Sequence, residues 1–236
     1  MALPKIDSPI FELKLPSNGE KIKYRPFLVK EEKILLMAMD GKDEEESARA
    51  IKQVLTNCCL EDGFDVNGLP IFDIEYFFLQ LRSRSMGEST TVNFKCEKCE
   101  ALTPVSIDLE TIEVKHNDAH ESRFNLNSTV GIAMKYPTLD MGPDLMVTNE
   151  DDVDGIFKVI VSCIDYIFDQ ENIYSHKDTS KKELEEWLMT LTQDQFEKVK
   201  AFFETMPKLS IELDVTCKKC GHEDSKHLEG LQSFFA

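Results

Sequence analysis

Two Cys-x-x-Cys pairs are the part of this sequence best suited to chemistry. CEKC supplies Cys96 and Cys99, and CKKC supplies Cys217 and Cys220. The spacing lets both sulfurs of a pair point at one ion, and two such pairs supply the four thiolates of a structural zinc site, at about 2.3 Å from the metal. The sequence therefore predicts one Zn²⁺ bound by all four cysteines. Because a closed four-thiolate site leaves no position for a reactive water, the predicted zinc is structural and not catalytic.

The long separation between the two pairs does not argue against a shared site. Residues 100–216 lie between them. Closing a loop of this length costs about 4 kcal/mol by the logarithmic entropy law. Structural zinc contributes on the order of 10–16 kcal/mol in small zinc domains, so metal binding outweighs loop closure.

The residues around each pair, which together with its turn we call a knuckle, are compatible with thiolate ligands. Gly221 suits the tight turn after the second pair, whereas Glu100 occupies the equivalent place after the first and fits it less well. His222 is an alternative ligand, although a four-cysteine site does not need it. Positive charge near the sulfurs stabilises thiolates. The lysines that flank the knuckles are Lys95, Lys98, Lys218 and Lys219.

Two other interpretations of the pairs stay open, namely a disulfide or redox role and no function at all. A redox Cys-x-x-Cys normally opens a helix, whereas both pairs here follow strand-like segments. We expect the remaining cysteines, Cys58, Cys59 and Cys163, to act as small buried hydrophobic residues, because they lie in apolar helical stretches.

No other motif points to catalysis. His116 and His120 have the i, i+4 spacing of a helical metal site, but their segment is polar and lacks an HExxH pattern, so we expect surface histidines. The sequence contains no P-loop, GxGxxG or GxSxG motif. We therefore expect a protein that is not an enzyme.

The segments beside each knuckle have the composition of strands. Thr, Val, Phe and Ile are frequent in TTVNFK and PVSIDL around the first pair and in KLSIELDV before the second. We expect a split zinc ribbon, in which residues 89–110 and 208–230 form two distant β-hairpins with the cysteines at their tips.

The remaining segments predict an α+β fold with an N-terminal β-hairpin and a helical bundle core. Asn18-Gly19 lies between alternating runs and predicts the hairpin. Residues 1–88 are expected to hold this hairpin and three helices, namely a helical hairpin with a break near residues 40–41 and a helix that Gly87 ends. We expect the whole chain to form one compact unit.

Residues 111–207 are expected to form a mixed insert with a helical bundle. A pair of strands is predicted on either side of Asn127-Ser128, and the nearly apolar segment 152–168 predicts a central buried helix. Ser180 with Glu183 predicts a capping box. Thr192 predicts the cap of a second amphipathic helix, which ends before Pro207.

Composition and charge narrow the class of protein. The chain has 236 residues, 42% of them hydrophobic, and a net charge of −17. Nucleic-acid binding draws its affinity from Lys and Arg on phosphates, and acidic membranes attract the same residues, so we expect neither partner. No apolar run approaches the roughly 18 residues of a membrane span. The N-terminal residues lack the pattern of a signal peptide, so we expect synthesis in the cytoplasm, where thiols stay reduced.

Two strings near the N-terminus carry a resemblance to a known family. They are LPSNGEKIKYRPFLVKEEKILLMA and LPIFDIEYFFLQLRSRSMGE, with YRPF-then-KEEK and FDIEYFF-then-RSRS-Gly as their distinctive patterns. This part of the chain resembles the baseplate hub subunits of T-even-like, contractile-tailed bacteriophages. The resemblance is best over residues 3–100, and beyond them it consists of the general layout and the closing cysteines.

The resemblance implies a late viral protein that is made in the bacterial cytoplasm. Its implied partners are other baseplate hub and tail proteins, and the family supplies no catalytic residues. The resemblance leaves open whether such a subunit stays in the virion, in the tail baseplate, or leaves as an assembly chaperone. An alternative function is a zinc-ribbon regulatory module that binds host transcription or nucleic-acid machinery, which the charge of −17 disfavours.

Overall fold

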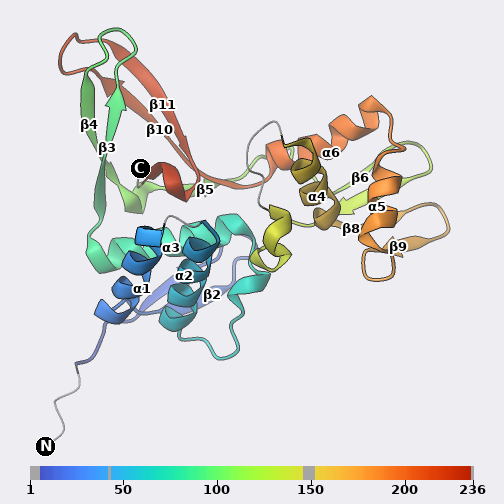
Figure 1. Cartoon of the computed structure of the whole chain (residues 1–236), viewed down its shortest axis with the longest axis horizontal. Helices are drawn as coiled ribbons and strands as arrows, with labels where there is room; N and C mark the ends of the chain where they lie inside the picture. Colours follow the sequence, from blue (N-terminus) through green and yellow to red (C-terminus); the bar gives the residue numbers. More distant parts are fainter. Residues whose placement is uncertain (1–5, 42–43, 146–151, 235–236) are drawn as a thin grey trace, which may run out of the picture. The chain divides into compact units, whose positions relative to one another are not determined.

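The computed structural model describes residues 6–41, 44–145 and 152–234 (Figure 1). The chain divides into two compact units. Unit 1 combines Met1–Lys115 with Lys208–Ala236, and unit 2 is His116–Pro207. Within the described residues the fold is mixed, with six α-helices and small antiparallel sheets. None of these helices has both the length and the apolar character needed to cross a bilayer.

Unit 1 begins with the predicted β-hairpin. Strands β1 (Phe11–Lys14) and β2 (Lys21–Tyr24) pair antiparallel, which confirms the interpretation of Asn18-Gly19. Gly19 has a φ of +73°, a conformation that glycine adopts without steric cost. The Asn18 side chain accepts a hydrogen bond from the backbone N–H of Glu20 at 2.8 Å and so holds the turn.

The three predicted N-terminal helices are confirmed. They are α1 (Val29–Gly41), α2 (Glu44–Cys58) and α3 (Ile71–Met86). Gly87 follows α3 with a φ of +116°, and its N–H donates to the carbonyl of Ser83, so the predicted stop is also confirmed. Phe77 of α3 is fully buried and packs edge-on against Tyr24 of the hairpin, with ring centroids 5.5 Å apart.

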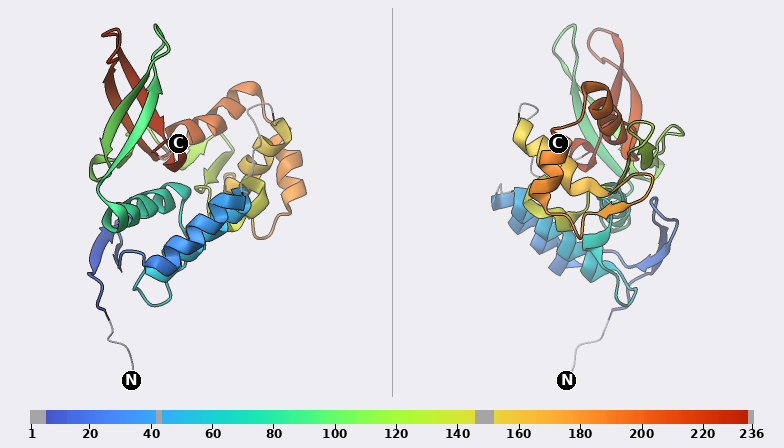
Figure 2. Two further views of the ribbon diagram at one scale, coloured as in Figure 1. Left: turned by 60° about the vertical axis from the view of Figure 1, so that its left-hand side comes forward. Right: turned by 90° about the vertical axis from the view of Figure 1, so that its right-hand side faces the viewer.

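Two further sheets of unit 1 carry the knuckles. β3 (Ser89–Lys95) pairs with β4 (Leu102–Asp108) in one sheet. The other sheet has the order β11-β10-β5. Its strands are β5 (Glu113–Lys115), β10 (Lys208–Thr216) and β11 (Glu223–Glu229). The two hairpins lie side by side in both views of Figure 2, the green one being β3–β4 and the red one β10–β11. Both predicted hairpins are therefore present, and β10 gains a second neighbour, β5, that the sequence did not predict.

An apolar core lies at the bases of these hairpins. Leu79 of α3, Ile107 of β4 and Leu209 of β10 are buried together with Leu109 and Phe234. Leu109 begins the short 3₁₀ turn Leu109–Thr111, and Phe234 ends the turn Leu231–Phe234. The C-terminal turn thus closes the core that the ribbon strands share with α3.

Unit 2 packs helices on a four-stranded antiparallel sheet of order β6-β7-β8-β9. The sequence predicted a mixed insert with a helical bundle, and here the helices pack on strands. Ile132, Ile164 and Ile167 of the strands are buried with Leu184 and Phe202 of the helices. The strands are β6 (Arg123–Asn125), β7 (Gly131–Met134), β8 (Ile164–Phe168) and β9 (Ile173–Ser175). The helices are α4 (Val153–Cys163), α5 (Lys181–Leu188) and α6 (Gln193–Thr205).

The helix predicted over residues 152–168 is too long. α4 ends at Cys163, and Ile164–Phe168 is the strand β8, which pairs with β7 and β9 on its two sides. A short segment rich in apolar residues suits a strand as well as the end of a buried helix, and periodicity alone does not distinguish the two. Before α4, Leu139–Leu145 forms short 3₁₀ turns, and residues 146–151 lie outside the described residues.

Side-chain caps fix the starts of α5 and α6. Ser180 and Glu183 form the predicted capping box, with reciprocal hydrogen bonds between each side chain and the other residue's backbone N–H. Thr192 and Gln195 form a second capping box at α6. Each box satisfies backbone donors that the first helical turn leaves without intrahelical partners.

Candidate metal centre

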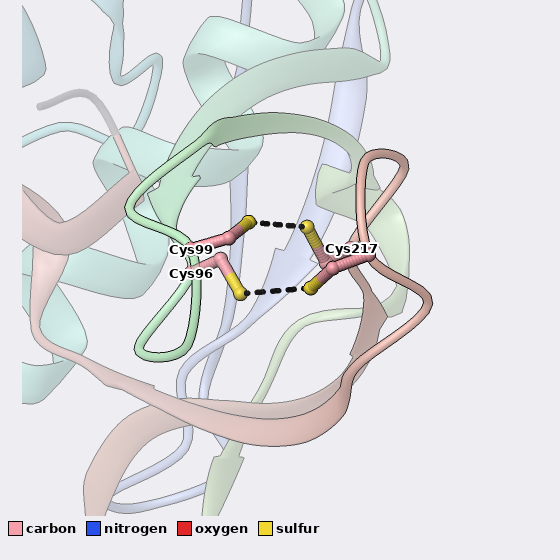
Figure 3. Close-up of side chains that lie close together, drawn as sticks. Cys96, Cys99 and Cys217 are labelled. Atoms are coloured by element: carbon pink, nitrogen blue, oxygen red, sulfur yellow. Dashed lines mark hydrogen bonds between the residues drawn. The ribbon is translucent and has the colours of Figure 1, made fainter.

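The four cysteines of the two knuckles come together in unit 1. The sulfurs of Cys96 and Cys220 lie 3.7 Å apart, and those of Cys99 and Cys217 lie 3.6 Å apart. All four sulfurs lie within 4.8 Å of one another. Figure 3 shows the side chains of the two knuckles facing each other across the space between the hairpin tips. The structure therefore brings together every cysteine that the sequence predicted as a zinc ligand.

The two knuckles have the same backbone hydrogen bonds. The N–H of Cys96 donates to the carbonyl of Ala101 at 3.0 Å, and the N–H of Glu100 donates back to the carbonyl of Cys96 at 2.9 Å. Cys217 repeats the pattern with His222 and Gly221, at 2.8 and 2.9 Å. Equal backbone geometry in two distant segments places the sulfurs as two equivalent halves of one site.

The turn position after each pair has a left-handed backbone. Gly221 has a φ of +69° and Glu100 a φ of +56°. Glu100 is the only residue other than glycine with a positive φ in the described part of the chain. The weaker fit expected for Glu100 is thus visible as a backbone conformation that costs a residue with a side chain more than it costs glycine.

The sulfurs have unequal proton affinities. Hydrogen bonds from the backbone N–H groups of Cys220 and Lys219 lower the pKa of Cys217 to about 6. The N–H of His222 lowers the pKa of Cys220. Contacts with the sulfurs of Cys99, Cys217 and Cys96, together with desolvation, raise this pKa by more, so that it is about 12. The sulfurs share hydrogen bonds and compete for protons, as thiols in one small space must. A dication among them allows all four to ionise.

Two of the lysines near the knuckles make contacts that the structure describes. Lys219 acts on Cys217 through its backbone N–H. The ammonium of Lys95 lies 3.4 Å from the carboxylate of Glu100, and both side chains are exposed. The sequence did not single out Lys226, which pairs with Glu97 at 2.7 Å and so joins β11 to the first knuckle.

The cysteines outside the knuckles have raised pKa values, so their thiols stay protonated. Cys58 and Cys163 are fully buried, and burial raises their pKa values to about 11 and about 12. Cys59 is half-buried, and burial raises its pKa as well. No disulfide joins any cysteine of the chain.

The histidines do not form a metal site. His116 and His120 lie in a non-helical segment, so their spacing does not place them on one helix face. His116 is exposed, but His120 is not the surface residue that we expected, because its ring stacks on Tyr136 and contacts Phe202. His222 lies beside the cysteine cluster and contributes through its backbone.

One of the distinctive strings near the N-terminus contains a buried ion pair. In YRPF-then-KEEK, Arg25 pairs at 3.1 Å with Glu31, whose side chain is fully buried. Arg25 also donates to the carbonyl of Asn57 at the end of α2, and Glu31 accepts from the N–H of Leu28 at the start of α1. These residues join the end of β2 to both helices.

The second string, FDIEYFF-then-RSRS, makes similar connections from α3. Asp73 is fully buried and accepts hydrogen bonds from the N–H and hydroxyl of Ser17 in the hairpin turn. Ser85 accepts from the N–H of Phe27, and Glu75 accepts from the N–H of Leu231 near the C-terminus. Both strings therefore mark polar junctions between elements of unit 1.

Three large apolar side chains of α1 are exposed. Val29, Leu36 and Met37 are 80%, 60% and 64% exposed. Their spacing of seven and eight residues places them on the same side of the helix. Glu32 and Lys33 lie between Val29 and the other two on that side, so the exposed apolar group consists of Leu36 and Met37. Sequence periodicity did not identify Leu36 and Met37 as exposed, because they belong to the continuous apolar run of residues 34–39.

Comparison with known proteins gives the class of this protein. The family described as "T4 bacteriophage base plate protein" matches residues 8–236. The chain belongs to this family of phage base plate proteins. It is also 25% identical over 184 residues to the baseplate hub assembly protein gp26 of Enterobacteria phage T4, which covers 78% of this chain and 81% of that protein. No solved structure matches the chain.

These matches confirm the resemblance drawn from the two N-terminal strings. The family match also extends well beyond residue 100, through unit 2 and the second knuckle. A role in the phage baseplate, through contact with other baseplate proteins, follows from the family.

Proposed function

We propose that this protein helps to assemble the hub of the tail baseplate by binding other baseplate proteins, and that it catalyses no reaction. The observation that carries the proposal is the match to gp26, named a baseplate hub assembly protein, over most of both chains. Of the two functions considered from the sequence, this match favours hub assembly over a regulatory zinc module.

The exposed apolar residues of α1 support a protein-binding role. Large apolar side chains that gather on one exposed helix face typically mark contacts with other proteins. Leu36 and Met37 form such a group, and Leu28 and Val29 are also exposed near the start of α1. We assign this face to contact with another baseplate protein, because that is the class of partner that the family implies.

The test is affinity purification of the tagged chain from phage-infected cells, followed by mass spectrometry of the bound proteins. We expect other baseplate proteins to co-purify with the wild type. The double substitution Leu36→Glu and Met37→Glu should remove them, because it places two charges on the apolar face. Met189→Glu is the matched control, since Met189 is 62% exposed and lies in unit 2.

Two results would contradict the proposal. Purification that yields no other tail protein would exclude assembly through stable contacts, and equal loss of partners in both variants would exclude the α1 face. Quantifying the chain in purified virions and in assembly intermediates decides between a chaperone and a subunit. A chaperone is present only in the intermediates, whereas a subunit is present in both.

A further inference from the structure

We propose that Cys96, Cys99, Cys217 and Cys220 bind one Zn²⁺, and that this ion is a local clasp between the tips of two β-hairpins. The clasp would hold the tips of β3–β4 and β10–β11 together, while the apolar core of unit 1 holds their bases. This proposal does not depend on the hub-assembly function.

The sulfur positions fit a tetrahedral metal site better than a disulfide. Four sulfurs at about 2.3 Å from a central zinc ion lie about 3.8 Å from one another. The observed distances of 3.7 and 3.6 Å between sulfurs of opposite knuckles are close to this edge. A disulfide needs about 2.05 Å between sulfurs, so its formation would require the knuckles to move.

The arrangement of the strands explains why the tips need a connection. β3–β4 and β11-β10-β5 are separate sheets, and no backbone ladder joins them among the residues that the structure describes. At the bases, buried Val92 and Ile107 of the first sheet pack with Leu209 of the second. At the tips, the ion pair between Lys226 and Glu97 and the cysteine cluster link the hairpins.

The ligand set also indicates which metal binds. Four thiolates in a tetrahedral arrangement are typical of zinc or of iron–sulfur sites. Both knuckles hold their sulfurs by backbone hydrogen bonds around a space that suits a single ion, since all four sulfurs lie within 4.8 Å of one another. We therefore assign Zn²⁺ and not an iron cluster, which needs more room.

The first experiment measures metal content and affinity in the full-length chain, expressed with added zinc. We expect one zinc and no iron per wild-type chain by elemental analysis. Cys220→Ser should lower zinc affinity by about 100-fold or more, because it removes a ligand. Its side chain is exposed, so the substitution disturbs little packing. Cys59→Ser is the control, since Cys59 lies in unit 1 outside the cluster, and it should bind zinc as the wild type does.

The second experiment separates a local clasp from a site that unit 1 needs for folding. Amide hydrogen exchange is compared in the zinc-bound chain and after removal of zinc by a chelator. We expect the amides of Cys96, Glu100, Cys217 and Gly221 to lose protection, because their hydrogen bonds lie within the knuckles. Leu109 belongs to the buried core, and its amide donates to the carbonyl of Glu88. This amide should keep its protection.

Each outcome decides one part of the proposal. A chain without zinc, a chain that holds iron, or equal zinc affinity in Cys220→Ser and wild type would overturn the metal assignment. Loss of protection throughout unit 1 on chelation would overturn the local clasp in favour of zinc-dependent folding. If Cys220→Ser does not fold, Co²⁺ titration of the wild type replaces it, and a spectrum without thiolate-to-cobalt charge transfer would exclude the site.

Discussion

At the scale of single residues, the two knuckles differ at one turn position. Gly221 and Glu100 both have left-handed backbones, at φ values of +69° and +56°. A side chain added at Gly221 would meet no atom within 4 Å, so only the backbone conformation opposes substitution there. Substitution of Gly221 therefore measures the cost of the left-handed backbone without a change in packing.

We predict that Gly221→Ala destabilises the protein by about 1 kcal/mol, because alanine adopts the left-handed conformation less readily than glycine. Glu100→Gly should have the opposite sign and a similar size, reduced by the lost contact with Lys95. Urea unfolding with zinc present measures both. Gly221→Asn is the control and should cost less than alanine, since asparagine tolerates this backbone region. Equal stability of the alanine and glycine proteins would contradict the strain argument.

At the scale of elements, Arg25 joins the hairpin to the helices of unit 1. The carboxylate of Glu31 at the start of α1 is fully buried, whereas Arg25 is 15% exposed. Burial raises the pKa of Glu31, but hydrogen bonds from Arg25 and from the N–H of Leu28 lower it by more. The carboxylate is therefore ionised in the folded protein and depends on its partners.

Arg25→Met should destabilise the protein by about 3 kcal/mol or more, because it leaves a buried carboxylate without its main partner. Lys30→Met is the matched control. Lys30 also lies near Glu31, at 3.3 Å, but its side chain is 67% exposed, so we expect a loss of no more than about 1 kcal/mol. Equal losses in the two variants, measured by urea unfolding, would show that Arg25 has no special role.

The same pair gives a pH dependence with a definite sign. The folded-state pKa of Glu31 lies below its ordinary value of 4.5. Its contribution to stability is therefore fully present above that value and is lost as the pH falls through the lowered pKa. The stability difference between wild type and Arg25→Met should shrink below pH 4.5, and a difference that grows on acidification would contradict the assignment.

At the scale of the whole molecule, unit 2 is an insertion into a β-hairpin of unit 1. Lys115, the last residue of β5, lies directly opposite Lys208, the first residue of β10, in the antiparallel ladder. Unit 2 leaves and rejoins unit 1 at these two neighbouring positions. Unit 2 also has its own hydrophobic core, which packs helices on its four-stranded sheet.

We predict that residues 116–207 can be replaced by Asn-Gly without unfolding unit 1. A two-residue turn of this type joins directly opposed strand ends in a β-hairpin. The shortened chain should remain monodisperse, unfold cooperatively and bind the same amount of zinc per chain as the full-length protein. Aggregation or loss of zinc would show that unit 1 needs unit 2. As the control, residues 116–207 expressed alone should fold, because their core is complete within them.

The sequence by itself determined the features that depend on neighbouring residues. Asn18-Gly19 specified a hairpin, and Ser180 with Glu183 specified a helix start, because both act through hydrogen bonds and backbone angles within a few residues. Each Cys-x-x-Cys spacing likewise specified a knuckle. The family could also be recognised from local strings such as YRPF-then-KEEK. Within seven residues, this string holds both partners of the ion pair between Arg25 and Glu31.

Only the tertiary structure decided the features that depend on distant partners. Ile164–Phe168 became a strand because β7 and β9 pair with it on both sides, although its apolar composition equally suited a buried helix. Lys115 of β5 lies opposite Lys208 of β10 although the whole of unit 2 separates them in the sequence. Local sequence carries no signal for such contacts, because their free energy comes from burial, pairing and charge that exist only once the chain has folded.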